Sequence, residues 1–224
     1  MDKTNLSELE EQFKSTSNTD AHYELDKKYY AYLENEIEKD PMNVQALIHL
    51  GFLSWEPFHQ EKKAIDYLKK AIEYDPNNVD ARFWLAKCYY HDCCDYEEAR
   101  RITLEALKID PKRSDCLSLL AMIIEDTTED WNEAICYLKK AIQYTPDWPE
   151  LHFFLASQYL NIKDIKSAEF EIEKALELSN IHIEKPKNAI EKYYELIVTG
   201  RNRTSESITL ELLKERIREA KEWT

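Results

Sequence analysis

Glycine is almost absent from this sequence, which has only Gly51 and Gly200 among its 224 residues. Glycine is the residue that most easily adopts positive φ, the conformation needed in tight β-hairpins and phosphate-binding loops. Two distant glycines cannot form the GxGxxG or GxxxxGKS/T loop of a nucleotide-binding fold. The composition therefore excludes those loops and predicts helices joined by short turns without glycine.

Long apolar segments are missing as well. No window approaches the roughly 18 consecutive apolar residues of a membrane-spanning helix, and residues 1–9 lack the basic-then-apolar pattern of a signal peptide. The five cysteines are irregularly spaced in a chain that is large enough to fold without disulfide bonds. We therefore expect a cytoplasmic protein that does not bind a membrane.

Positive charge is scarce, because 30 Lys and Arg residues stand against 44 Asp and Glu residues, giving a formal net charge of −14. A negative field of this size repels phosphate groups, so it disfavours nucleic acid as a direct ligand. Anionic membrane surfaces are disfavoured for the same reason. The charge favours a basic protein or peptide as the partner.

Four prolines divide the chain into segments of equal length. Pro41, Pro76, Pro111 and Pro146 lie 35 residues apart, and two of the segments that end at them are nearly the same, AIDYLKKAIEYDP and AICYLKKAIQYTP. Proline cannot continue a helix and restricts the residue before it, so each proline predicts a helix end. A fourth copy, residues 168–180, lacks the terminal proline.

A second helical segment precedes each copy. Its apolar residues lie three and four apart, which places them on one face of an α-helix. In each segment a leucine is followed by glycine or alanine, and so small a side chain lets the partner helix pack closely. These pairs are Leu50–Gly51, Leu85–Ala86, Leu120–Ala121 and Leu155–Ala156, and the facing helices carry Ala64, Ala99, Ala134 and Ala168.

Two antiparallel helices in each unit of about 34 residues resemble the tetratricopeptide repeat family. The resemblance covers residues 42–180 as four repeats, and Asp95–Ala99 and Asp130–Ala134 look like the family's usual opening of the second helix. It implies an all-α fold, a right-handed α-solenoid of about four helical hairpins. The family's early tryptophan is replaced by Leu47, Arg82, Leu117 and His152.

The two ends of the chain are interpreted as caps of the repeats, which occupy residues 41–180. Residues 1–40 would form N-terminal capping helices or a degenerate repeat, with a helix rich in tyrosine and glutamate at residues 19–39. Residues 181–224 would form C-terminal capping helices. The last of these, at roughly residues 205–222, is highly charged on its outer face, as the end of a solenoid must be to stay soluble.

The segment from Cys88 to Asp95 is the strongest candidate for chemistry, because it holds three thiols, an imidazole and two carboxylates. Structural zinc sites usually combine two separated pairs of ligands, and the chain offers no second pair. Cys88 lies on helical spacing and is expected to be buried, whereas Cys93 and Cys94 fall in a turn between helices. A reactive thiol needs a lowered pKa, of which the sequence gives no sign. We therefore predict no metal, no cofactor and no enzymatic activity.

The first helix of each repeat has a second face beside its packing face. In tetratricopeptide proteins the matching positions line a concave surface that holds a peptide or helix, so the resemblance implies a groove. Its aromatic side chains would supply contact area, and its carboxylates would favour a basic or amphipathic partner. The alternative is that these side chains pack against a neighbouring repeat or a terminal helix. The predicted groove residues are Gln45, Ile48, Phe52, Trp55, Asp80, Phe83, Lys87, Tyr90, Asp115, Ser118, Met122, Glu125, Glu150, Phe153, Ser157 and Leu160.

One subtype of the family is disfavoured. Its chaperone cofactors hold a C-terminal carboxylate with a clamp of two lysines, two asparagines and one arginine. The corresponding positions of this chain hold only one cation, so an acidic C-terminal ligand would meet net negative charge. These positions are Phe52, Lys87, Met122 and Ser157.

Three functions remain. The leading hypothesis is an adaptor or chaperone-like module that holds a basic or amphipathic segment of another protein in the groove. A small acidic chain also suits an immunity protein that neutralises a basic toxin domain. The third hypothesis is a self-associating scaffold, a homo-oligomer with the tyrosine-rich stretch from Tyr23 to Tyr32 as its interface.

Overall fold

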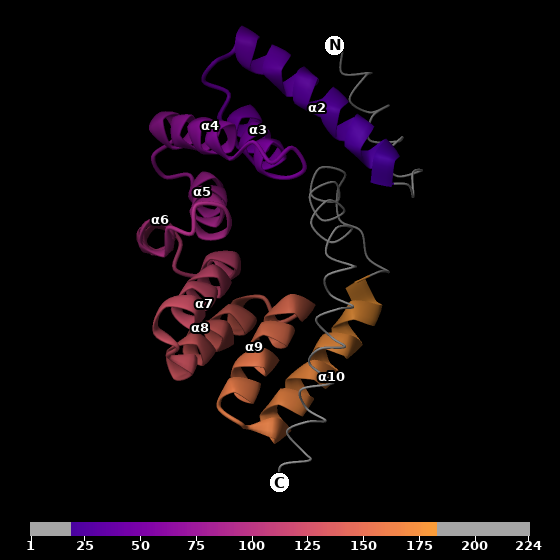
Figure 1. The fold of residues 1–224 in the computed structure, drawn as a ribbon, viewed down its shortest axis with the longest axis vertical. Coiled ribbons are helices and arrows are strands. Elements are labelled where there is room, and N and C mark those ends of the chain that lie inside the picture. The colour runs from indigo at the N-terminus through magenta and orange to yellow at the C-terminus, as the bar shows by residue number, and fades with distance from the viewer. Residues whose placement is uncertain (1–18, 183–224) are drawn as a thin grey trace. The chain divides into compact units, whose positions relative to one another are not determined.

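A computed structural model of the chain describes residues 19–182 (Figure 1). Within this range the structure consists of nine α-helices and contains no strand, which confirms the predicted all-α class. The chain divides between Pro111 and Lys112 into two compact units, here called unit 1 and unit 2. Unit 1 holds α2 (Thr19–Lys39), α3 (Val44–Trp55), α4 (Glu61–Tyr74), α5 (Val79–His91) and α6 (Tyr96–Ile109); unit 2 holds α7 (Ser114–Thr128), α8 (Trp131–Tyr144), α9 (Pro149–Asn161) and α10 (Ile165–His182).

From Thr19 onward, unit 1 is a long helix followed by two helical hairpins. The first hairpin, α3 with α4, packs against the second, α5 with α6, and α2 lies along α3 (Figure 1). α2 confirms the helix predicted at residues 19–39, and its tyrosines attach it to α3. Tyr29 Oη lies 2.8 Å from His49 Nδ1, and Ser54 Oγ donates to Tyr30 Oη at 3.3 Å. These two tyrosines of the tyrosine-rich stretch therefore pack within the chain.

Up to His182, unit 2 consists of two hairpins, α7 with α8 and α9 with α10, which meet where α8 packs against α9. The Ser114 hydroxyl at the start of α7 donates to the Ala141 carbonyl near the end of α8 at 3.1 Å. α10 has 18 residues, whereas α4, α6 and α8 each have 14. The physical reason is the missing proline, since α10 continues through Asn180, where the earlier copies have a stop.

Local signals in the sequence account for most helix ends. α4, α6 and α8 each end two residues before a proline, which confirms the prolines as stops. Five helices begin with a side chain that accepts a hydrogen bond from a backbone N–H of the first turn, an arrangement that stabilises a helix by about 1 kcal/mol. These N-caps are Asn43, Asn78, Asp95, Asp130 and Asp164, with distances of 3.1, 2.9, 3.1, 3.0 and 3.2 Å.

Each hairpin turn contains one residue other than glycine in the left-handed conformation. These are His59, Cys94, Glu129 and Lys163, with φ values of 51, 49, 51 and 61°. A non-glycine residue in this region costs roughly 1–2 kcal/mol because its Cβ approaches the following carbonyl oxygen. The prediction of turns without glycine is confirmed, and it comes with a small strain in every hairpin.

Gly51 serves helix packing instead of a turn. It lies inside α3, and a Cβ atom added to it would stand 2.5 Å from Leu68 Cγ on α4. Since Leu68 is fully buried, an alanine at this position would force a shift that typically costs about 1–3 kcal/mol. The predicted alanines at the other helix crossings are likewise fully buried: Ala64, Ala86, Ala99, Ala134, Ala156 and Ala168.

Candidate partner-binding surface

The predicted groove residues come from α3 and α5 in unit 1 and from α7 and α9 in unit 2. Those of the predicted groove residues that are buried lie beneath the surface and support the others. That the groove residues contact a partner stays a prediction. Six are buried (Ile48, Phe52, Trp55, Ser118, Phe153, Leu160), eight are half-buried (Phe83, Lys87, Tyr90, Asp115, Met122, Glu125, Glu150, Ser157), and Gln45 and Asp80 are exposed.

Trp84 is the centre of an aromatic cluster between α3 and α5. Its ring centroid lies 4.6 Å from that of Phe52, 5.9 Å from that of Trp55 and 5.1 Å from that of Phe83. Aromatic pairs at such distances contribute about 0.5–1.5 kcal/mol each beyond the area they bury. The α3–α5 aromatic cluster is defined here as Phe52, Trp55, Phe83, Trp84, Tyr90 and His91, the last two being in edge contact at 4.6 Å.

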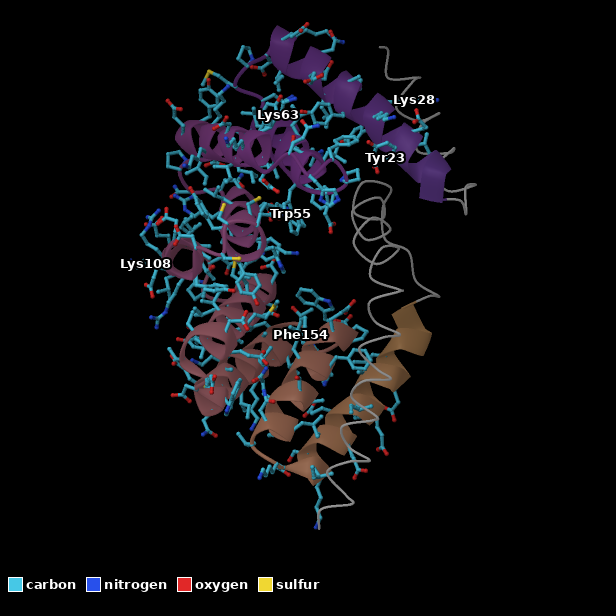
Figure 2. All side chains as sticks on the ribbon, viewed as in Figure 1. Tyr23, Lys28, Trp55, Lys63, Lys108 and Phe154 are labelled. Carbon is cyan, nitrogen blue, oxygen red and sulfur yellow. The ribbon has the colours of Figure 1, made fainter. Side chains whose placement is uncertain are left out.

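Lys87 completes this cluster with a positive charge. Its ammonium group lies 4.8 Å from the centroid of Trp55, 5.1 Å from that of Trp84 and 5.7 Å from that of Phe83. Cation–π contacts of this kind contribute about 0.5–2 kcal/mol, more when the cation is shielded from water. In Figure 2, Trp55 projects from one side of unit 1 and Lys108 on α6 from the other.

Carboxylates stand beside the cluster. Asp92 follows directly after α5, and its pKa is raised, first by burial and then by the carboxylates of Glu61 and Glu56, although a hydrogen bond from Trp55 opposes the shift. Asp80 is exposed in the first turn of α5. Both ends of the aromatic surface on α5 therefore carry negative charge.

His49 connects α2 to the same face of α3. It is 8% exposed, with Tyr29 Oη on Nδ1 and Gln45 Nε2 on Nε2, both at 2.8 Å. Burial lowers its pKa from 6.5 to about 4, although Asp80 opposes the shift. His49 is consequently neutral at physiological pH.

The corresponding surface of unit 2 is polar. Glu125 on α7 accepts a hydrogen bond from Gln158 Nε2 on α9 at 2.6 Å, and Gln158 is only 2% exposed. Asp115 accepts from Arg113 at 2.9 Å. The aromatic groove residue of this unit, Phe153, is buried. Unit 2 therefore offers carboxylates and amides where unit 1 offers rings.

His152 stands where the family has a tryptophan, and it links α9 to α10. Its Nδ1 lies 2.6 Å from Glu171 Oε2, and its Nε2 lies 3.3 Å from the Pro146 carbonyl oxygen. The hydrogen bond to Glu171 raises its pKa, and burial opposes the shift. Because both ring nitrogens face acceptors, the geometry fits an imidazolium.

The three cysteines of the segment from Cys88 to Asp95 lie where the sequence predicts them. Cys88 is buried and its pKa is raised by burial, whereas Cys93 and Cys94 are exposed in the turn between α5 and α6. Across residues 19–182, no three His, Cys, Asp or Glu side chains are grouped so that they could hold a metal ion. Over the same range, no helix is long and apolar enough to cross a membrane.

Sequence reasoning missed Trp84, His49 and His91. The groove residues predicted on α5 are Asp80, Phe83, Lys87 and Tyr90. Positions 80, 84, 87 and 91 lie equally well along one face of a helix, so helical spacing could have included Trp84 and His91. The link from His49 to α2 has no local signal, because Tyr29 is 20 residues away.

Helical hairpins with small residues at their crossings and proline stops at regular intervals define a helical repeat protein. The tetratricopeptide repeat model matches residues 59–123, and a second model of the same description matches residues 149–182. The chain therefore contains tetratricopeptide repeats.

Solved structures confirm the solenoid fold. The chain is similar to TTC0263, a tetratricopeptide protein of Thermus thermophilus, with 18% identity, a TM-score of 0.62, and coverage of 87% of this chain and 98% of that one. It is similar to MamA with 19% identity and a TM-score of 0.58, and the match covers 83% of this chain and 99% of that one. It is also similar to YrrB, a tetratricopeptide protein described as having an unusual peptide-binding site. The identity is 17%, the TM-score is 0.54, and the match covers 84% of this chain and 91% of that one. No curated protein matches the chain in sequence. The repeats make this chain a protein-interaction module.

Proposed function

We propose that the chain is an adaptor or chaperone-like module that binds a basic or amphipathic segment of another protein at the α3–α5 aromatic cluster. The observation that carries the proposal is the row of half-buried side chains on α5, Phe83, Lys87 and Tyr90, with exposed Asp80 at its start. Large rings held by buried neighbours lose little entropy on binding, which is why aromatic side chains dominate binding hot spots.

Charge supports a basic partner. Asp80 stands at one end of α5 and Asp92 at the other, with Glu56 and Glu61 close enough to Asp92 to raise its pKa. The whole chain carries a formal net charge of −14. Complementary charge of this kind speeds encounter and rejects acidic competitors. We expect the affinity to fall as salt is added, because exposed carboxylates are screened.

The net charge also favours a second candidate, an immunity protein that neutralises a basic toxin domain. The two candidates differ in the form of the partner. A chaperone-like module holds an extended or helical segment, so a synthetic segment of the partner should bind almost as well as the whole. An immunity protein recognises a folded surface, which a segment would not reproduce.

A capture experiment with two matched variants tests the surface. Wild type, a Phe83→Ala/Tyr90→Ala variant and a Tyr74→Ala/Ile109→Ala control are used as baits in lysate of the source organism. Tyr74 and Ile109 end α4 and α6 and are 38% and 39% exposed, so the control removes comparable apolar surface outside the cluster. Binding of each captured protein is then measured by calorimetry.

The proposal expects a basic protein that binds wild type and the control equally. Loss of two hot-spot rings should weaken that binding by at least about 2 kcal/mol, or more than about 30-fold. Equal binding to all three baits, or capture of acidic proteins only, would place the site elsewhere. Light scattering on the same samples tests self-association, which a mass of one chain would contradict.

A further inference from the structure

Two neighbouring thiols stand in the turn between α5 and α6. Cys93 and Cys94 are both exposed and unpaired by any disulfide. Hydrogen bonds fix the turn around them, from Cys93 N to the Cys88 carbonyl at 3.3 Å and from Asp95 N to the Tyr89 carbonyl at 3.0 Å. Neither thiol is used in packing between helices, and the proposed partner surface does not need them.

The spacing of the pair suits a shared ligand better than a disulfide. Neighbouring Cα atoms lie about 3.8 Å apart, whereas unstrained disulfides need about 4.4–6.8 Å. A disulfide would also require the two sulfur atoms to approach to about 2.0 Å. One larger atom bonded to both sulfurs removes that requirement, since the sulfurs then stay well apart.

The surroundings discriminate between ligands. A metal cation binds thiolates, so its affinity depends on deprotonation of the thiols. Burial and then the carboxylates of Asp92, Glu61 and Asp95 raise the pKa of Cys93, which opposes this step. Within residues 19–182 no third side chain joins the pair to make a metal site. A neutral ligand that takes up protonated thiols fits better.

We propose that Cys93 and Cys94 together form a binding site for trivalent arsenic. In As(OH)₃ two As–O bonds break and two As–S bonds form, and each departing hydroxide leaves with one thiol proton as water. Phenylarsine oxide reacts in the same way, its single oxygen leaving with both protons as one water. Arsenic remains trivalent, so no oxidant is needed, and no net proton is released.

Intact-mass spectrometry of the reduced full-length chain with phenylarsine oxide tests the site. We expect one phenylarsenic group per chain, retained in excess monothiol and removed by a dithiol such as 2,3-dimercaptopropanol. Cys93→Ser and Cys94→Ser should each abolish the monothiol-resistant adduct. Cys136→Ser is the matched control, because Cys136 is exposed on α8 without a neighbouring thiol.

Alkylation of wild type gives a readout that needs no variant. Bound arsenic should protect Cys93 and Cys94 from iodoacetamide while Cys136 is still labelled. An adduct that monothiol removes, or one that persists in either serine variant, would overturn the proposal. Cadmium in place of the arsenical should bind wild type no more tightly than it binds Cys94→Ser, and clearly tighter binding would show a metal site instead.

Discussion

Units 1 and 2 share one framework and differ on the first helix of each repeat. Trp55 and Tyr90 in unit 1 and Glu125 in unit 2 stand at the same place in successive repeats, each 35 residues apart. The first two belong to the aromatic cluster, whereas Glu125 binds the buried amide of Gln158 at 2.6 Å. Buried small residues stand at the helix crossings of both units, glycine at position 51 and alanine elsewhere. Packing between helices is therefore constrained in every repeat, whereas the residues on the second face of the first helix differ between the units.

The units should differ most in the free energy of unfolding that is lost when the side chain at the same repeat position is replaced by alanine in each. Trp84 is 5% exposed in the aromatic cluster, and Phe154, two repeats later, is half-buried. Trp84→Ala should lower the free energy of unfolding by about 3–5 kcal/mol, and Phe154→Ala by clearly less. Urea denaturation followed by circular dichroism measures both. Equal losses would mean that the cluster adds no stability of its own.

Two histidines should make the units respond oppositely to pH. The folded-state pKa of His49 is about 4, below its ordinary value of 6.5, so the unfolded state binds more protons between these values. Its contribution, on the order of 3 kcal/mol, should be lost as pH falls from about 6.5 to 4. The folded-state pKa of His152 is raised, so its contribution is complete below 6.5 and is lost as pH rises through the raised value.

Unfolding free energies measured across this pH range in wild type, His49→Gln and His152→Gln separate the two effects. The first variant should flatten the acidic side of the profile and the second the neutral side. A profile that keeps its acidic slope in His49→Gln would show that the slope comes from carboxylates instead.

The polar contact of unit 2 should have a moderate effect. Glu125→Leu leaves the buried Gln158 amide without its partner and should cost about 1–3 kcal/mol. Replacing both residues by leucine removes the unsatisfied group, so the double variant should lose less than the sum of the single variants. Additive losses in this double-mutant cycle would show that the contact is not coupled.

The smallest expected effect on stability comes from two exposed lysines, and it should be the same in both units. Lys69 stands over the ring of Tyr89 at 5.7 Å, and Lys139 over that of Tyr159 at 5.4 Å, at equivalent places two repeats apart. Both lysines are exposed, so Lys69→Met and Lys139→Met should each change stability by less than about 1 kcal/mol. Thermal denaturation of the two variants checks this equality. Clearly different shifts in the unfolding midpoint would show that the two lysine contacts are not equivalent.

Sequence predicted the framework because its signals are local. Proline stops, the helix opening at Asp95–Ala99 and the helix at residues 19–39 depend on neighbours within one or two turns. The division into an aromatic unit and a polar unit depends on contacts between helices, such as Glu125 with Gln158, 33 residues apart. Burial of Ile48 and Trp55 within the predicted groove likewise follows from packing between helices, which spacing along one helix does not show.

The left-handed residues in the hairpin turns have a consequence for engineering this protein. Glycine at His59, Glu129 or Lys163 would relieve the strain at positive φ, and its greater freedom in the unfolded chain would offset part of the gain. A net gain of a few tenths to about 1 kcal/mol per turn is expected, and gains at distant turns should add. The chain thus offers separate sites at which stability can be raised stepwise, without altering its helices or the proposed partner surface.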